Sequence, residues 1–436
     1  MPVLRPEFPD HGSPFSREQE RRRKEAAILT AAARRFDEHG FAHTRLEDVA
    51  ADLGLTKTSI SYYFTGKEEL AEAVYRASAE ILHDAVDAAA SASGDAATRL
   101  ERLFAIYAEE LREASEGRRP YLAALRDLDA LSEEARTSVT ARVSDCVSGI
   151  NAMVMDWIDQ SGAALGRPEP VTFLILALLD WLGERQSAPV AQDREADCDT
   201  LLDLVCHGLL AGPTERLAPS FVSVDADDAP GIFDRDARNR MKREAFMKAG
   251  ARLFNQKGYG GVSLAEVAAS LGVSRGAFYY HIPDKEQFLD QCLDRSLQVV
   301  ETTLDHAEAD ETAPLTFVRR GLIELIYRQA AGLDPLLRPS LAAILGPARQ
   351  RRHKARMRNI SRRIGDALTE ASACGEGRMV DTVVVEDIMA SVMFLNGGYT
   401  LTAANSFSSW NLSEDPRTAA ADYVYLLFHG LRGAAR

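Results

Sequence analysis

Apolar side chains recur every three or four residues along most of this chain, which is the period of a helix with one buried face. One such stretch includes Ile28 and Phe36 and stops at Gly40, and another includes Phe254 and stops at Gly258. A glycine in this place is the usual helix C-cap, because it adopts a left-handed conformation without steric cost. The alternation of Val, Ile and Thr that marks strands is nearly absent. The pattern therefore predicts an all-α protein.

A long segment of this pattern occurs twice. Residues 21–75 and 239–293 align without a gap, so that Phe254 falls on Phe36. The correspondence continues further along the chain, where the sequence RPYLAAL at 119–125 returns as RPSLAAI at 338–344 and the tripeptide His-Gly-Leu at 207–209 returns at 429–431. The spacing drifts by only a few residues, which indicates duplication of one whole unit of about two hundred residues.

The duplication also sets the domain boundaries. A chain of 436 residues is too long for a single core. Residues 1–16 are polar and proline-bearing, and residues 212–233 combine prolines with the acidic run Asp225-Ala226-Asp227-Asp228, so we expect a disordered tail and a linker. We call the four predicted domains the first head (17–76), the first body (77–211), the second head (234–295) and the second body (296–436).

Each head is predicted to contain the amphipathic helix described above and two shorter helices that are separated by a glycine turn. After the first amphipathic helix, the pattern predicts a second helix at 46–53 or 264–271, then a tight turn at Gly54 or Gly272, where positive φ is needed. Thr56 or Ser274 then stands as the N-cap of a third helix. This order is that of a helix-turn-helix, which predicts that the protein reads DNA.

The third helix carries the candidate chemistry. Ile60 and Phe64, or Phe278 and Ile282, share one face and should pack inward. The other face offers short hydroxyls, one cation and tyrosines, which can approach phosphates and base edges in a major groove. In the first head the predicted DNA contacts are Thr44, Arg45, Thr56, Lys57, Thr58, Ser59, Ser61, Tyr62, Tyr63 and Lys67. In the second head they are Ser263, Ser274, Arg275, Gly276, Ala277, Tyr279, Tyr280, His281 and Lys285.

Lys57 and Arg275 are the foremost of these, because they lie early in an exposed helix. Lys67 and Lys285 stand at the start of a fourth helix, where a cation opposes the helix dipole. A phosphate of bound DNA would compensate that cost. For the tyrosines the choice between core packing and phosphate contact stays open.

At this point both copies resemble the DNA-binding domain of the TetR family of bacterial transcriptional regulators. The matching elements are Phe36/Gly40/Phe41 and Phe254/Gly258/Tyr259, the pairs Val49-Ala50 and Val267-Ala268, the Leu-Gly turns, and an aromatic cluster followed by Lys-Glu. The resemblance implies a three-helix head joined to a helical body that binds a small-molecule effector and dimerises, often in a repressor that the effector releases from its double-stranded DNA operator.

Two units in one chain imply an intrachain pseudo-dimer, although a homodimer with four heads stays open. The expected interface is made by the helices at 171–183, 199–210, 386–396 and 420–431. Two departures from the family pattern indicate unequal heads. A tyrosine is usual at the position of Tyr279, where the first head has Ser61, and Ser263 can cap the second helix where the first head has Arg45. Unequal heads favour an asymmetric operator.

Charge refines this interpretation. The net charge of −14 argues against a general polyanion binder, yet the first head carries eleven Lys/Arg against eleven Asp/Glu and the second head eleven against eight. Heads with this charge suit a sequence-specific DNA-binding protein whose affinity depends on a few well-positioned contacts. A basic run at 349–363 coincides with apolar residues at helical spacing, which favours a solvated helix face. Pairing with the acidic first half, or binding of an anionic ligand such as an acyl-coenzyme A, remains the alternative.

Other functional classes find little support. The sequence shows no catalytic triad, paired-carboxylate motif, phosphate-binding loop or metal-ligand spacing, so we expect no enzyme, no cofactor and no metal. The longest apolar run, 171–182, is too short to span a bilayer, and we expect a cytoplasmic protein without a membrane partner. The alternative function is a small-molecule receptor or interaction module in which one or both heads no longer bind DNA. Repression and activation are not distinguished.

Overall fold

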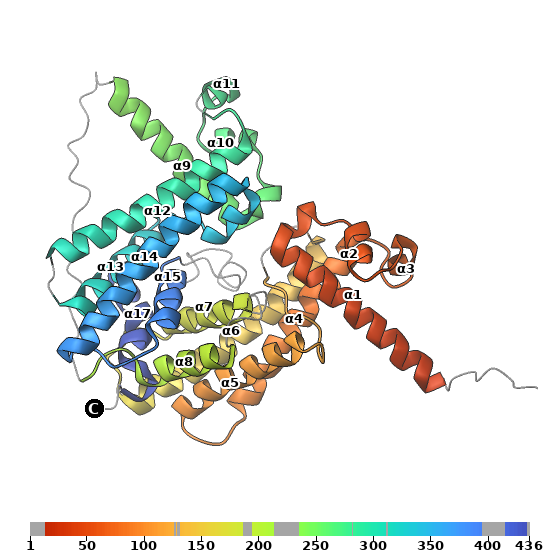
Figure 1. Cartoon of the computed structure of the whole chain (residues 1–436), viewed down its shortest axis with the longest axis horizontal. Coiled ribbons are helices and arrows are strands. Elements are labelled where there is room, and N and C mark those ends of the chain that lie inside the picture. The colour runs from red at the N-terminus through yellow and green to blue at the C-terminus, as the bar shows by residue number, and fades with distance from the viewer. Residues whose placement is uncertain are drawn as a thin grey trace, which may run out of the picture.

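A computed structural model describes residues 14–125, 128, 131–185, 194–212, 235–280, 282–310, 313–394 and 415–433 (Figure 1). All of its named elements are helices, which confirms the predicted all-α class. In the first half these are α1 (Pro14–His43), α2 (Leu46–Asp52), α3 (Lys57–Ser61), α4 (Lys67–Ala90), α5 (Ala96–Ser115), α6 (Glu133–Ser161), α7 (Glu169–Glu184) and α8 (Arg194–His207). In the second half they are α9 (Arg235–Gly261), α10 (Leu264–Ser270), α11 (Arg275–Tyr279), α12 (Lys285–Asp310), α13 (Pro314–Ala330), the 3₁₀ helix η3 (Pro339–Ile344), α14 (Pro347–Cys374), α15 (Thr382–Val392) and α17 (Pro416–Gly433).

The domain boundaries drawn from the sequence remain predictions. The tail and the linker lie almost wholly outside the described residues, although α1 already begins at Pro14, within the expected tail. None of the helices in the described ranges is long and apolar enough to cross a membrane. The same part of the chain contains no group of three or more His, Cys, Asp or Glu side chains arranged to hold a metal ion.

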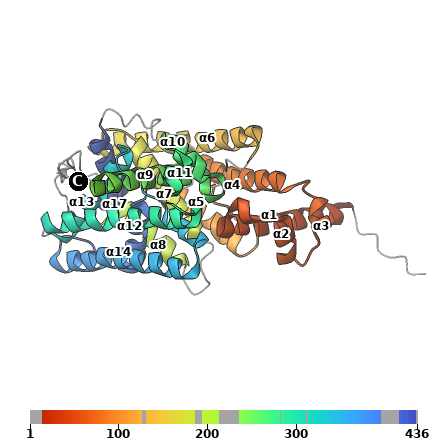
Figure 2. The ribbon, with the colours of Figure 1, turned by 90° about the horizontal axis from the view of Figure 1, so that it is seen from above.

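The heads consist of α1–α3 and α9–α11. In both views the first head projects at one end of the molecule, while the second head lies over the bodies (Figures 1 and 2). The turns between the second and third helices contain Gly54 at φ 64° and Gly272 at φ 65°, as predicted. The predicted C-caps behave differently. At Gly40 and Gly258 the backbone also takes positive φ and leaves helical geometry, as a C-cap does, but a further helical turn follows each glycine, so α1 and α9 each consist of two helical pieces joined by a kink.

The two bodies meet through four helices near the ends of the halves. Helix α17 packs against both α7 and α8, and α15 also packs against both. These elements overlap all four segments that the sequence analysis expected at the interface, of which residues 395–396 lie outside the described residues. The contact is therefore made within one chain, with each half supplying one pair of helices.

The repeated His-Gly-Leu tripeptides cross each other at the centre of this interface. Gly208 and Gly430 both have positive φ, 66° and 68°. A Cβ atom on Gly208 would lie 2.4 Å from the carbonyl oxygen of Phe428, and one on Gly430 would lie 2.4 Å from the carbonyl carbon of His207. The Phe428 carbonyl accepts hydrogen bonds from the amides of Leu209 at 3.1 Å and Leu210 at 3.0 Å. The halves thus touch backbone to backbone, which only glycine permits here.

Polar side chains fix the register around this crossing. The indole of Trp157 donates to the carbonyl of Leu431 at 2.8 Å, and the indole of Trp181 donates to the carboxylate of Asp387 at 3.0 Å. The guanidinium of Arg378 donates to the Gly208 carbonyl at 2.8 Å. Each of these bonds joins one half to the other. Directional bonds of this kind select one arrangement among those that the apolar surfaces alone would allow.

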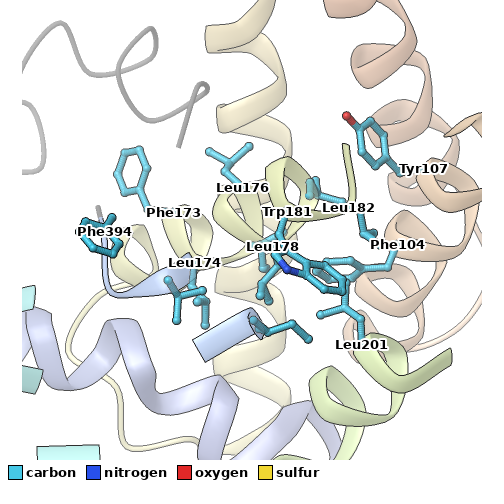
Figure 3. Close-up of a cluster of buried hydrophobic side chains, with 14 of the residues drawn as sticks. Phe104, Tyr107, Phe173, Leu174, Leu176, Leu178, Trp181, Leu182, Leu201 and Phe394 are labelled. Carbon is cyan, nitrogen blue, oxygen red and sulfur yellow. The ribbon is translucent and has the colours of Figure 1, made fainter. Parts of the chain in front are cut away.

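Large apolar side chains fill the space between the halves (Figure 3). Helix α7 is apolar on almost every face, and its buried residues include Phe173 and Trp181, with Phe394 of the second half close to Phe173. Of the large aromatic residues in the two bodies, Trp157, Phe173, Trp181, Phe317 and Phe394 are buried and Tyr327 is half-buried, while Tyr399 and Trp410 lie outside the described residues. The core of the first head is continuous with the bodies, whereas the second head has its own cluster.

The basic run at 349–363 lies on α14 and pairs with carboxylates of α12. Arg356 donates to Glu301 at 2.7 Å and 3.0 Å, and Arg363 donates to Asp305 at 2.8 Å. Arg356 and Arg363 are half-buried and depart from the expected solvated face, and their partners belong to the same half and not to the acidic first half. The physical reason is that α12 and α14 run side by side, which places opposite charges within reach along their length. The other basic residues of the run that fit the expectation are exposed: Arg351, Arg352, Lys354, Arg358 and Arg362.

The glycine crossing gives a stability prediction. We expect Gly208→Ala to lower the melting temperature much more than Gly162→Ala. Gly162 ends α6 with a similar φ of 67° but has open space around its Cβ position, so its substitution carries only the left-handed backbone cost of about 1 kcal/mol. Gly208→Ala adds a clash with backbone, which cannot move aside as a flexible side chain would, for a total of about 3 kcal/mol or more. If both substitutions lowered the melting temperature equally, the close backbone contact between Gly208 and Gly430 would be contradicted.

Candidate DNA-binding surfaces

The third helix of the first head is short and anchored by two apolar residues. Ile60 is fully buried and Phe64 is 4% exposed, so both pack inward as predicted. Thr56 caps α3 by accepting a hydrogen bond from the amide of Ser59 at 3.3 Å, and the two hydroxyl groups lie 3.0 Å apart. Helix α3 ends at Ser61, so the tyrosines stand in the turn that follows.

The opposite face of α3 is open to solvent. Thr56, Lys57, Thr58 and Ser61 are exposed, Ser59 and Tyr63 are half-buried, and the ring of Tyr62 is 77% exposed. Tyr62 and Tyr63 contact each other edge to face, with ring centroids 5.2 Å apart. The structure therefore gathers these predicted contact residues on one surface, with Tyr62 reaching furthest outward.

The second head repeats the arrangement with different side chains. Phe278 and Ile282 are fully buried, which confirms the predicted inward face. On the outer side Tyr280 is 85% exposed and Tyr279 is 46% exposed, and both Ser274 and Gly276 are exposed. A Cβ atom on Gly276 would have no neighbour within 4 Å, so nothing within the head requires glycine there. The side chains of Arg275 and Ala277, and the whole of His281, lie outside the described residues.

Lysines at the start of the fourth helices find partners inside their own heads. The ammonium of Lys67 donates to the Phe41 carbonyl at 2.9 Å and lies 4.0 Å from the centroid of the Phe41 ring. Lys285 lies 4.4 Å from the ring centroid of Tyr259, and burial lowers the pKa of this lysine. These contacts compensate the cation that opposes the helix dipole. The expected phosphate is therefore not needed to explain either lysine.

The residues that precede the second helix of each head make contacts within that head. Thr44 is 2% exposed, and its hydroxyl donates to the Gly40 carbonyl at 3.0 Å, so the structure does not place it on the predicted DNA surface. Ser263 caps α10 as predicted, accepting from the amide of Glu266 at 3.1 Å. At the corresponding exposed place in the first head, the amide of Arg45 donates to the carboxylate of Asp48 at 3.1 Å. The two heads thus begin this helix by different means.

The kinked ends of α1 and α9 meet between the heads. The rings of His43 and Tyr259 are stacked with centroids 6.2 Å apart. A cavity of about 180 Å³ lies beside this contact, lined by residues 36–41 of α1, 257–261 of α9 and residues of η3. Sequence reasoning missed this contact, because it depends on how the two halves sit against each other and on no local pattern.

Ion pairs distinguish the two DNA-facing surfaces. In the first head the ammonium of Lys57 lies 2.8 Å from the carboxylate of Glu47, across the turn between α2 and α3. In the second head the ammonium of Lys257 lies 2.5 Å from the carboxylate of Glu266, at the junction of α9 and α10. The first pair includes a predicted DNA contact and the second does not. The sequence analysis did not single out Glu47, because its contact with Lys57 depends on how α2 and α3 meet across the turn.

These features define the class of protein: a chain with two helix-turn-helix heads, each mounted on a helical body. The family model described as bacterial regulatory proteins of the tetR family matches residues 28–74 and 246–292. Both heads therefore match this family, which is consistent with two TetR-like units in tandem in one chain.

Known relatives match this chain over limited segments. The regulator RutR of Escherichia coli strain K12 is 49% identical over 53 residues, which are 12% of this chain and 25% of RutR. The regulator AcrR of Shigella flexneri is 32% identical over 85 residues, or 19% of this chain and 40% of AcrR. The crystal structure of PfmR from Thermus thermophilus aligns with 41% of this chain and 92% of its own, at 22% identity and a TM-score of 0.34.

The different caps give a second prediction. Replacing Ser263 by Ala removes a hydroxyl that accepts from a helix amide, so we expect α10 to lose about 1 kcal/mol of protection against hydrogen exchange. Replacing Arg45 by Ala should leave α2 protected, because the cap there uses the Arg45 backbone amide and the Asp48 carboxylate. Hydrogen exchange resolved by peptide compares both helices in one molecule. Comparable loss in α2 would show that this description of the caps is incorrect.

Proposed function

We propose that this protein is a sequence-specific DNA-binding transcriptional regulator, a repressor released by a small ligand, with two reading heads per chain. One observation carries the proposal. Where side chains are described, the exposed aromatic residues are Tyr62, Tyr279 and Tyr280, and all three stand at the ends of α3 and α11. Large rings left in water on a folded domain usually mark a binding surface. Here they flank hydroxyls and cations, which suits a phosphate backbone and base edges.

The charge of the heads supports a reader of particular sequences. Each head is close to neutral and the whole chain carries −14, so weak general attraction to DNA is expected. Affinity would then depend on a few contacts, for which Lys57, Tyr62 and Tyr280 are described candidates and Arg275 is a candidate from the sequence. Such a balance increases the ratio of specific to non-specific binding.

The packing of the bodies supports a pseudo-dimer. Helices α7, α8, α15 and α17 meet within one chain, so the surfaces by which two one-unit chains would pair are already covered. Two heads on such a body must lie about one helical turn of DNA apart, roughly 34–36 Å, to enter successive major grooves. Because the heads carry different residues on α3 and α11, the operator would have unlike halves.

Ligand control would act through the bodies. The match of both heads to the TetR family supports a small-molecule effector, and the helices around α7 connect both halves through a shared apolar core. A ligand that repacks this core in one body would alter the angle between the heads. A coupling of about 1 to 3 kcal/mol between ligand and DNA is typical of such systems.

The experiment for the proposed function is selection from a random duplex library with the full-length chain. We expect a bipartite site with unlike halves, bound by a protein with the mass of one chain. A symmetric palindrome bound by a two-chain species would replace the pseudo-dimer with a homodimer. No enrichment at low salt, where phosphate contacts are strongest, would reject the regulator and favour a small-molecule receptor with inactive heads.

The exposed tyrosines give a further prediction, which is tested by measuring the affinity of variants for the selected duplex. Tyr280→Ala should weaken binding roughly tenfold, the loss of one good hydrogen bond of about 1.4 kcal/mol, and change thermal stability little because the side chain is 85% exposed. Tyr62→Ala tests the first head in the same way. Met379→Ala is the matched control, since Met379 is 87% exposed in the second body. Tyrosine variants that bind like this control would refute the assigned surface.

A further inference from the structure

The ion pair between Glu47 and Lys57 lies on the DNA-facing surface of the first head. Lys57 is the first residue of α3, and Glu47 is in the first turn of α2. Their charged atoms are 2.8 Å apart, and the side chains are 57% and 55% exposed. The hydrogen bond from Lys57 lowers the pKa of Glu47 below its ordinary value. An exposed pair of this kind contributes little to folding stability.

The second head lacks this pair by sequence. The repeat aligns Lys57 with Arg275, and it aligns Glu47 with Ala265. The acid in the first turn of α10 is Glu266, the counterpart of Asp48, and it pairs with Lys257 at the end of α9. The second head therefore neutralises its acid with a residue outside the recognition helix.

The difference matters when a phosphate approaches. A cation that binds DNA gains affinity by releasing counterions from the phosphates, but a cation already held by a carboxylate first has to leave that partner. The carboxylate then stays beside the polyanion and repels it. In the first head both effects fall on the N-terminus of α3, the part of a recognition helix that usually contacts base edges.

We propose that Glu47 sets the affinity of the first head, holding Lys57 away from DNA so that the second head dominates operator binding. This inference rests on the proposed function. It assigns the ion pair a role in binding, which is compatible with its small contribution to folding stability. It also identifies one aligned position, Glu47 in the first head and Ala265 in the second, at which the residues can be exchanged.

The test exchanges these residues and measures binding to the selected duplex over a range of salt concentrations. We expect Glu47→Ala to tighten binding about three- to tenfold and to steepen the salt dependence by about one unit of log–log slope, the signature of one more neutralised phosphate. Adding Lys57→Ala to this variant should remove both gains. Ala265→Glu in the second head should weaken binding by a similar factor.

Controls separate the possible failures. Glu133→Ala removes an exposed negative charge from α6 in the first body, so it reports the effect of net charge alone. If Glu47→Ala behaves like Glu133→Ala, with wild-type binding intact, the inference is overturned and the proposed function stands. If the wild-type chain retains no duplex, the proposed function fails and this inference with it. Unchanged thermal unfolding of each variant shows that the comparison concerns binding.

Discussion

The backbone contact between Gly208 and Gly430 is the constraint on which the architecture depends. Helices with side chains at both positions could not approach so closely, and the amides of Leu209 and Leu210 could not reach the Phe428 carbonyl. This approach fixes the distance between the bodies, and the cross-half bonds of Trp157 and Trp181 then fix their rotation. Because α4 and α12 each connect one head to its body, the glycine crossing also determines the positions of the heads.

The helices that carry the heads are attached differently in the two halves. Helix α12 is tied to α14 by a series of ion pairs, among them Arg356 with Glu301 and Arg363 with Asp305. Helix α4 packs against α6, with Arg142 and Glu80 paired at 3.0 Å. The connecting helix of the second half is therefore held to α14 by several ion pairs, whereas that of the first half packs on α6 through a largely apolar core.

Much of the fold could be predicted from the sequence, because it depends on interactions between residues that are close in the chain. The period of apolar residues located the helices, the glycines located the turns, and the pairs Ile60/Phe64 and Phe278/Ile282 identified the inward faces. The duplicated His-Gly-Leu tripeptide even marked the interface. What it did not reveal is that the two glycines touch, since proximity of residues 208 and 430 is a property of the assembled halves.

What the sequence did not reveal has the same origin. The ring and carbonyl partner of Lys67, Phe41, is distant in sequence, and Thr44 is buried by residues that the fold brings against it. Arg356 and Arg363 of α14 pair with α12, which lies far upstream. Glu47 pairs with Lys57 across the turn between α2 and α3. Tertiary neighbours decide these cases, and a single sequence does not supply them.

Covalent pairing of the halves has a consequence for dosage. A regulator built from separate subunits loses its paired heads when diluted below its dimerisation constant, so its occupancy of an operator rises with the square of concentration. Here α7 and α8 meet α15 and α17 within one chain, so this contact does not depend on protein concentration. Under the function proposed above, operator occupancy at low protein concentration would rise in simple proportion to copy number.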